Sequence, residues 1–272
     1  MKIYDYDEKF FEYARTWMAI HPGLTEDQVE EHYNEMLRSW LNAPAKWLGG
    51  QKPGEYFNRY SDPRDLMKLM EEYEKRDIGL PEPLYSRVVA LGEACVPALS
   101  ALAANEDKSE VLRATAIAML RDIGGEIPVS LFVELVCFSE EPNELSEMAG
   151  EALAETDASV VDLLLERFDR ATEYGQMLIM DICSNYTEDP RVYDRLVALL
   201  RNRPRDREMY AGLLGKLGDP RAIEPLTETL KLTDLSYMEY IEVRDAIEEL
   251  GGDAGEERDF HGDPDFEAMR NL

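Results

Sequence analysis

Residues 208–232 read EMYAGLLGKLGDPRAIEPLTETLKL, and this stretch predicts one helix, a tight turn and a second helix. The turn falls at Gly218, Asp219 and Pro220. Asp followed by Pro is typical of a helix start, because the carboxylate accepts backbone N–H groups that lack a partner and Pro has no N–H to leave unpaired. We therefore interpret this stretch as one helical hairpin.

The same hairpin pattern recurs along the chain at a near-constant spacing. The predicted turns follow one another at steps of 32, 32, 32, 30 and 33 residues and lie at Gly92, Gly124, Thr156, Glu188, Gly218 and Gly251. Positions eight and four residues before each turn, and eight and twelve after it, are mostly apolar. Stacked amphipathic helix pairs require such columns, because a single pair cannot bury both of its apolar faces. A regular array of helix pairs is the predicted folding unit.

Two stretches resemble the HEAT-like repeats of the type found in phycobilin lyases. They are LGDPRAIEPL at 217–226 and LGEACVPAL at 91–99, and the resemblance covers roughly residues 81–252. It implies an all-α fold built as a right-handed α-α superhelix, a HEAT-like solenoid. It implies no single function, because this repeat family includes chromophore lyases, an iron-dependent lysine-modifying hydroxylase, DNA glycosylases and many plain scaffolds.

The spacing pattern divides the chain into three parts. Residues 81–252 are the predicted repeat array, and residues 253–272 are an acidic tail that we expect to be a loosely packed cap or partly disordered. Residues 1–80 do not keep the repeat period and predict a helical, aromatic-rich N-terminal cap. One helix should end at His21, and a capping box at Thr25 and Gln28 should start the next. This region is either a cap on the first repeat or a recognition module.

The charge of the chain limits its partners. Its 57 acidic and 29 basic residues give a formal net charge of −28. Such a surface repels phosphates, so nucleic-acid binding is disfavoured, and it favours a basic protein or peptide or only maintains solubility. The three cysteines lie far apart without a C-x-x-C pair. With no apolar leader and no run of about 18 apolar residues, the sequence predicts a cytoplasmic protein that does not bind membranes.

A column of acidic residues on the second helices is the candidate interaction site. Positions six and ten after the turns are one helical turn apart and carry Glu134, Asp162, Glu166, Asp194, Glu224 and Glu228. Second helices usually line the concave surface of HEAT-type arrays, so the column predicts a negative groove that attracts Lys or Arg side chains. The alternative is an ordinary solvated face. The oligomeric state is left open.

Catalytic patterns are weak in this sequence. The histidines are His21, His32 and His261, all outside the predicted array, and no His-Glu pair of the kind that binds iron in the hydroxylase occurs. We expect no metal and no cofactor. The leading interpretation is a non-enzymatic scaffold that binds a basic protein or peptide. The alternative is an enzyme or accessory factor of the HEAT-like lyase class that acts on a small molecule or chromophore.

Overall fold

The computed structural model of the chain describes residues 2–23, 25–124, 128–186 and 189–270. Over these residues the secondary structure is helical, with one isolated bridge between Ala45 and Gln51 and no strand. The predicted all-α class is confirmed. The chain divides into two compact units, Met1–Leu131 and Phe132–Leu272, here called unit 1 and unit 2.

Unit 1 contains the helices that sequence signals had predicted near its start. Thr25 and Gln28 form the expected capping box, and Asp62 caps a helix that begins at Pro63. The helices are α1 (Tyr6–Ile20), α2 (Glu26–Glu31), α3 (Tyr33–Asn42), α4 (Pro63–Glu74), α5 (Glu82–Ala90), α6 (Val96–Ala103) and α7 (Glu110–Ile123), with 3-10 helices η1 (Lys46–Leu48), η2 (Pro53–Arg59) and η3 (Gly92–Ala94). α8 (Val129–Cys137) crosses into unit 2.

An aromatic core holds the first residues of unit 1 in place. The Tyr6 ring lies edge-on to Trp40 and Trp47, with ring centroids 5.7 and 5.4 Å away. The Tyr6 hydroxyl donates to the carbonyl of Pro53 at 3.2 Å, and Tyr73 donates to the carbonyl of Tyr4 at 3.1 Å. Each of these tyrosines thus buries its ring while its hydroxyl donates a hydrogen bond to a backbone carbonyl, as tyrosines in a core require. The aromatic residues therefore build a core of their own.

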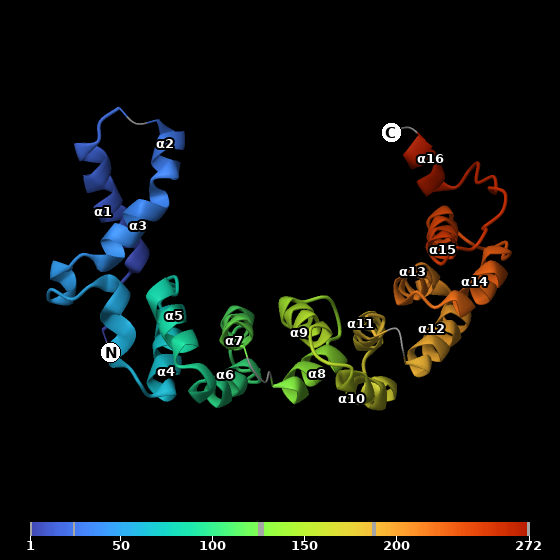
Figure 1. Cartoon of the computed structure of the whole chain (residues 1–272), viewed down its shortest axis with the longest axis horizontal. Helices are drawn as coiled ribbons and strands as arrows, with labels where there is room; N and C mark the ends of the chain where they lie inside the picture. The colour runs from blue at the N-terminus through green and yellow to red at the C-terminus, as the bar shows by residue number, and fades with distance from the viewer. Residues whose placement is uncertain (1, 24, 125–127, 187–188, 271–272) are drawn as a thin grey trace. The chain divides into compact units, whose positions relative to one another are not determined.

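Unit 2 consists of consecutive helix pairs. Its helices after α8 are α9 (Glu144–Ala154), α10 (Ser159–Arg167), α11 (Glu173–Cys183), α12 (Pro190–Asn202), α13 (Arg207–Leu217), α14 (Ile223–Leu230), α15 (Tyr237–Glu249) and α16 (Pro264–Arg270), with 3-10 helices η4 (Phe168–Arg170), η5 (Pro204–Asp206) and η6 (Pro220–Ala222). We call α9, α11, α13 and α15 the first helices, and α8, α10, α12 and α14 the second helices. Figure 1 shows the two sets as two rows within this unit.

The backbone confirms most of the predicted turns. Gly92, Gly124, Gly218 and Gly251 have φ values of 58°, 68°, 72° and 79°. This left-handed region is where glycine ends a helix without a steric penalty. Asp189 caps α12 and Asp219 caps η6, each accepting from the backbone N–H two residues on. The predicted turn residue Glu188 lies outside the described residues.

Two pairs of first helices in unit 2 pack closely. α9 contacts α11, and α13 contacts α15. Glycine allows this approach, since Gly212 and Gly215 on α13 lie directly beneath Glu242 and Ala246 of α15. In Figure 1 the row of first helices lies on the inner side of the curve that the unit 2 helices follow.

The tail packs against the last helices. The Arg258 guanidinium donates to the carbonyls of Leu230 and Leu232 at 2.6 and 2.7 Å, at the C-terminal end of α14. Phe260 is buried against Tyr240, and Phe266 lies edge-on to Tyr237 at 5.1 Å. The described residues of the tail therefore contact the end of α14 and the start of α15.

The three cysteines, Cys95, Cys137 and Cys183, are free and buried. Burial raises the pKa of the Cys137 thiol to about 11 and that of Cys183 to about 12, so both are held in the unreactive thiol form. Within the described ranges, every helix is too short or too polar to cross a membrane.

Candidate interaction surfaces

The predicted acid column lies on the second helices, and arginines interrupt it. All six column residues are exposed. Three of them form ion pairs with arginines of neighbouring helices: Glu134 with Arg167 at 3.2 Å, Asp162 with Arg191 at 2.6 Å and Glu228 with Arg201 at 3.0 Å. These long side chains connect successive second helices. The column is therefore a ladder of alternating charge.

The other three column residues, Glu166, Asp194 and Glu224, are exposed and have no ion pair among the described residues. Glu166 and Asp162 line a shallow hollow of about 440 Å³ together with Arg191 and Arg195. Arg195 itself pairs with Asp169 at 3.1 Å and lies over the Phe168 ring. Two positive side chains thus share this hollow with the two carboxylates.

The position of the column also differs from the prediction. The sequence interpretation placed the second helices on a concave surface, whereas in unit 2 the first helices form the inner row. That placement is wrong for this unit. The packing agrees with this arrangement: glycines on α13 let α15 approach closely, whereas arginine side chains span from one second helix to the next.

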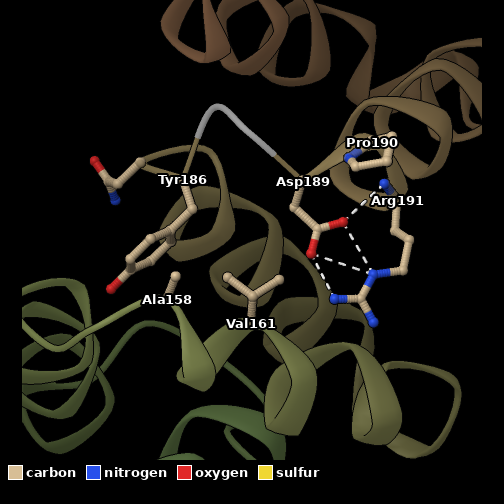
Figure 2. A pocket seen from close by; sticks show the side chains of 7 residues that line it. Ala158, Val161, Tyr186, Asp189, Pro190 and Arg191 are labelled. Atoms are coloured by element: carbon tan, nitrogen blue, oxygen red, sulfur yellow. Dashed lines mark hydrogen bonds and ion pairs between the residues drawn. The ribbon is translucent and has the colours of Figure 1, made fainter.

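A cavity of about 660 Å³ lies between α10 and the start of α12. It is lined by Ala158, Val161, Asn185, Tyr186, Asp189, Pro190 and Arg191. Figure 2 shows Asp189 and Arg191 facing each other on one side of it, joined by contacts of 2.5 to 3.2 Å, and Tyr186 on the other side. The Tyr186 hydroxyl contacts the carbonyls of Leu153 and Thr156 at 3.1 and 3.0 Å. The polar groups of this cavity are thus engaged within the chain.

The same Asp-Pro-Arg arrangement occurs at residues 219–221, where it permits a test. Hydrogen bonds from Arg221 hold the pKa of Asp219 below its ordinary value of 3.8. A lowered folded-state pKa adds stability above the unfolded pKa and loses it as the pH falls through the folded pKa. Asp219→Asn keeps the N-cap and removes the charge. We expect a loss of about 0.5–1 kcal/mol at pH 7.

Urea unfolding of the wild type and this variant from neutral to strongly acidic pH measures the effect. The difference in unfolding free energy should disappear below the lowered pKa. A difference that stays constant with pH would show that the charge of Asp219 is not its source.

A second acidic surface lies on the first helices. We call it the first-helix acid stripe, and it consists of Glu147 on α9, Asp181 on α11, Glu208 on α13, and Glu242 and Glu249 on α15. Burial raises the pKa of Tyr174, and the negative charges of Glu147 and Asp181 raise it further. Both carboxylates therefore lie near the same ring. The Glu242 and Glu249 carboxylates lie over Gly212 and Gly215. The stripe therefore crosses all four first helices.

The carboxylates at the α13 and α15 end repel one another. Partial burial raises the pKa of Glu242, and the neighbouring charges of Asp245, Glu208 and Glu249 raise it further. Lys216 is a cation within this region, and its Nζ lies 2.7 Å from Asp181. The sequence does not predict the stripe, because only the apolar positions of the first helices repeat at a fixed spacing. Glu147 and Glu242 both stand nine residues before a predicted turn, but Asp181, Glu208 and Glu249 do not, so no fixed spacing in the sequence marks the stripe.

No protein-family model matches the chain, and no curated protein matches it in sequence. Over the described residues, no three or more His, Cys, Asp or Glu side chains are grouped in a way that could hold a metal ion.

Proposed function

We propose that this chain is a non-enzymatic, cytoplasmic HEAT-like scaffold, built as a right-handed superhelix, that binds a basic protein or peptide on its acidic concave face. The observation that carries the proposal is the cluster of carboxylates where α15 packs on α13. The Glu242 and Glu249 carboxylates lie over Gly212 and Gly215, and burial together with the charges of Asp245, Glu208 and Glu249 raises the pKa of Glu242. Negative charges that raise the pKa of a neighbouring carboxylate destabilise the free protein. A cationic partner would relieve this repulsion.

The pairing of Lys216 with Asp181 indicates how a partner side chain would be received. Lys216 Nζ contacts both the Asp181 carboxylate, at 2.7 Å, and the Asp181 backbone carbonyl, at 3.1 Å. A Lys or Arg of a partner would meet the same kind of acceptors at Glu208, Glu242 and Glu249. Several such contacts in a row favour a partner with clustered basic residues.

The first-helix acid stripe is favoured over the column on the second helices. A basic partner at Asp162 or Glu228 would have to compete with Arg191 or Arg201, which already occupy those carboxylates. Among the described residues, no arginine has to be displaced at Glu242. The charges that act on it come from Asp245, Glu208 and Glu249, and all of them are negative. The enzyme alternative would use the cavity beside Asp189, where the charged groups are already paired with each other.

Binding of a fluorescein-labelled decalysine peptide tests the proposal. Fluorescence anisotropy would be measured between about 0.02 and 0.3 M NaCl, because exposed charges are screened over this range. We expect saturable binding at low salt whose Kd increases steeply with salt. A neutral Gly-Ser peptide of equal length should not bind. If the two peptides bind equally, or neither binds at low salt, the proposal fails.

Glu242→Gln provides a test of the repulsion within the free protein. A raised folded-state pKa means that ionisation costs more in the folded protein, so the penalty is absent below the ordinary value of 4.5 and present above the folded pKa. At pH 7 the variant should therefore be as stable as the wild type or more stable, by a few tenths of a kcal/mol. The gain should vanish on acidification.

Urea unfolding at pH 7 and at a pH below 4.5 measures this gain, with Glu224→Gln as the matched control. Glu224 is exposed on α14, outside the stripe, and its substitution should have little effect at either pH. A loss of stability in Glu242→Gln at pH 7 would contradict the repulsion on which the proposal rests.

A further inference from the structure

A cavity of about 510 Å³ in unit 1 lies between α1, α3 and the start of α5. It is separate from the first-helix acid stripe, which belongs to unit 2. Four aromatic rings line it, Tyr6, Phe10, Tyr33 and Trp40, and its charged lining residues are Asp7, Arg38 and Glu82. The lining therefore combines ring surfaces with more negative than positive side chains.

The aromatic part of the lining is rigid on one side and open on the other. Tyr6, Phe10 and Trp40 are buried, and the Phe10 ring lies edge-on to Trp40 at 5.4 Å. Tyr33 is 48% exposed and lies edge-on to Phe10 at 5.5 Å. Packing against one another fixes the orientation of the rings. A flexible side chain could enter beside Tyr33 and contact rings that are already in place.

The charged part of the lining comes from three different helices. Asp7 is exposed on α1 beside Gly79, and Glu82 is exposed in the first turn of α5, where it accepts a hydrogen bond from Ser86. Arg38 is exposed on α3 and has no ion pair among the described residues. Two carboxylates against one guanidinium favour a cation, and Arg38 can turn into solvent because it is tied to neither carboxylate.

We propose that this cavity binds the arginine side chain of a peptide, because a planar guanidinium stacks on aromatic rings. Such a side chain has an apolar stem that suits the rings and a cation that suits Asp7 and Glu82. Cations are also attracted to the faces of Trp and Tyr rings. The inference goes beyond the proposed function, since it assigns a site on the other unit and does not depend on the acid stripe.

The probe for this site is N-acetyl-argininamide, compared with N-acetyl-citrullinamide, its uncharged analogue of nearly the same shape. The readout is the indole N–H resonance of Trp40 in a ¹⁵N-labelled sample of the full chain. We expect saturable shifts of this resonance with the arginine compound and at least about fivefold weaker binding of the citrulline compound. Equal binding of the two compounds, or no shift with arginine, would overturn the proposal.

Two variants locate the binding. Tyr33→Ala should weaken binding of the arginine probe about two- to fivefold, because it removes an exposed aromatic wall. Asp7→Asn combined with Glu82→Gln should have a similar or larger effect. Asp65→Asn, at a half-exposed acid elsewhere in unit 1, is the control and should leave Kd unchanged. Equal effects of Asp65→Asn and the double variant would show charge attraction without a site.

The failure of this inference is distinguishable from that of the proposed function. Substitutions in the first-helix acid stripe should leave the Trp40 shift intact, while substitutions around this cavity should leave the salt-dependent binding of decalysine largely intact. If arginine binding follows the stripe residues instead, this cavity is not the site.

Discussion

Replacing Glu208, Glu242 and Glu249 with Lys is expected to weaken decalysine binding by at least about 30-fold at low salt. Each reversal removes an attractive charge and adds a repulsive one, and exposed pairs contribute up to about 1 kcal/mol each. Replacing Asp162, Asp194 and Glu224 with Lys changes the net charge by the same amount. Since these residues lie on the second helices, that variant should lose only about threefold, through long-range attraction.

The comparison of these two triple variants separates position from net charge. Anisotropy titrations give the Kd values, and far-UV circular dichroism with thermal unfolding confirms that both variants remain folded. If the second-helix variant loses as much affinity as the first-helix variant, binding follows total charge. If it loses more, the column predicted from the sequence is the binding surface.

Gly175→Ala is expected to destabilise unit 2 by about 3 kcal/mol or more. Gly175 lies in the first turn of α11, where its N–H donates to the Thr172 hydroxyl at 2.9 Å, and Thr172 in turn donates from its backbone to the Cys137 carbonyl at 3.0 Å. An added Cβ would overlap the backbone carbonyls of Val136 and Cys137. The overlapping atoms belong to the backbone and cannot rotate away. The helices α8 and α11 would have to separate to make room for the methyl group.

Gly150→Ala is the matched control for this prediction. Its Cβ would lie 3.6 Å from a methyl group of Ile182, an ordinary contact, and Ala favours a helix interior over Gly by about 1 kcal/mol. The control should therefore be neutral or stabilising. Urea unfolding measures both variants. A small effect of Gly175→Ala would show that α8 and α11 are not packed as closely as described.

The sequence predicted the helix pairs of this chain well, because the period places the same chemical signal at each repeat. Glycine with positive φ ends helices at Gly92, Gly124, Gly218 and Gly251, and Asp189 and Asp219 start the helices that follow. Apolar positions eight and four residues before the turns are almost all buried, as shown by Leu84, Leu120, Tyr210 and Ile247. Local rules of capping and amphipathicity suffice for these features.

The charged surfaces could be predicted only in part. The column positions identified one exposed face of the second helices, but ion pairs such as Arg191 with Asp162 join residues 29 positions apart, on different helix pairs. Likewise, the inner row is determined by how closely Gly212 and Gly215 allow α15 to approach α13. These ion pairs and close helix contacts form between different helix pairs. The sequence of one helix pair therefore does not predict them.

The aromatic N-terminal region shows the same limit. Tyr6 and Pro53 lie 47 residues apart, yet the tyrosine hydroxyl closes on the proline carbonyl. No periodicity links these two positions in the sequence. Tyr6 also lines the cavity beside Trp40, so the arrangement of rings in that cavity could not be predicted from spacing.

The most direct test of the account is to locate a bound basic peptide on the protein. A decalysine peptide carrying one nitroxide spin label would be added to the ¹⁵N-labelled chain at low salt, and the broadening of each backbone amide resonance measured. The account predicts broadening centred on α11, α13 and α15 near Asp181, Glu208 and Glu242. Broadening centred on α10, α12 and α14 near Asp162, Asp194 and Glu224, or spread evenly over the chain, would contradict it.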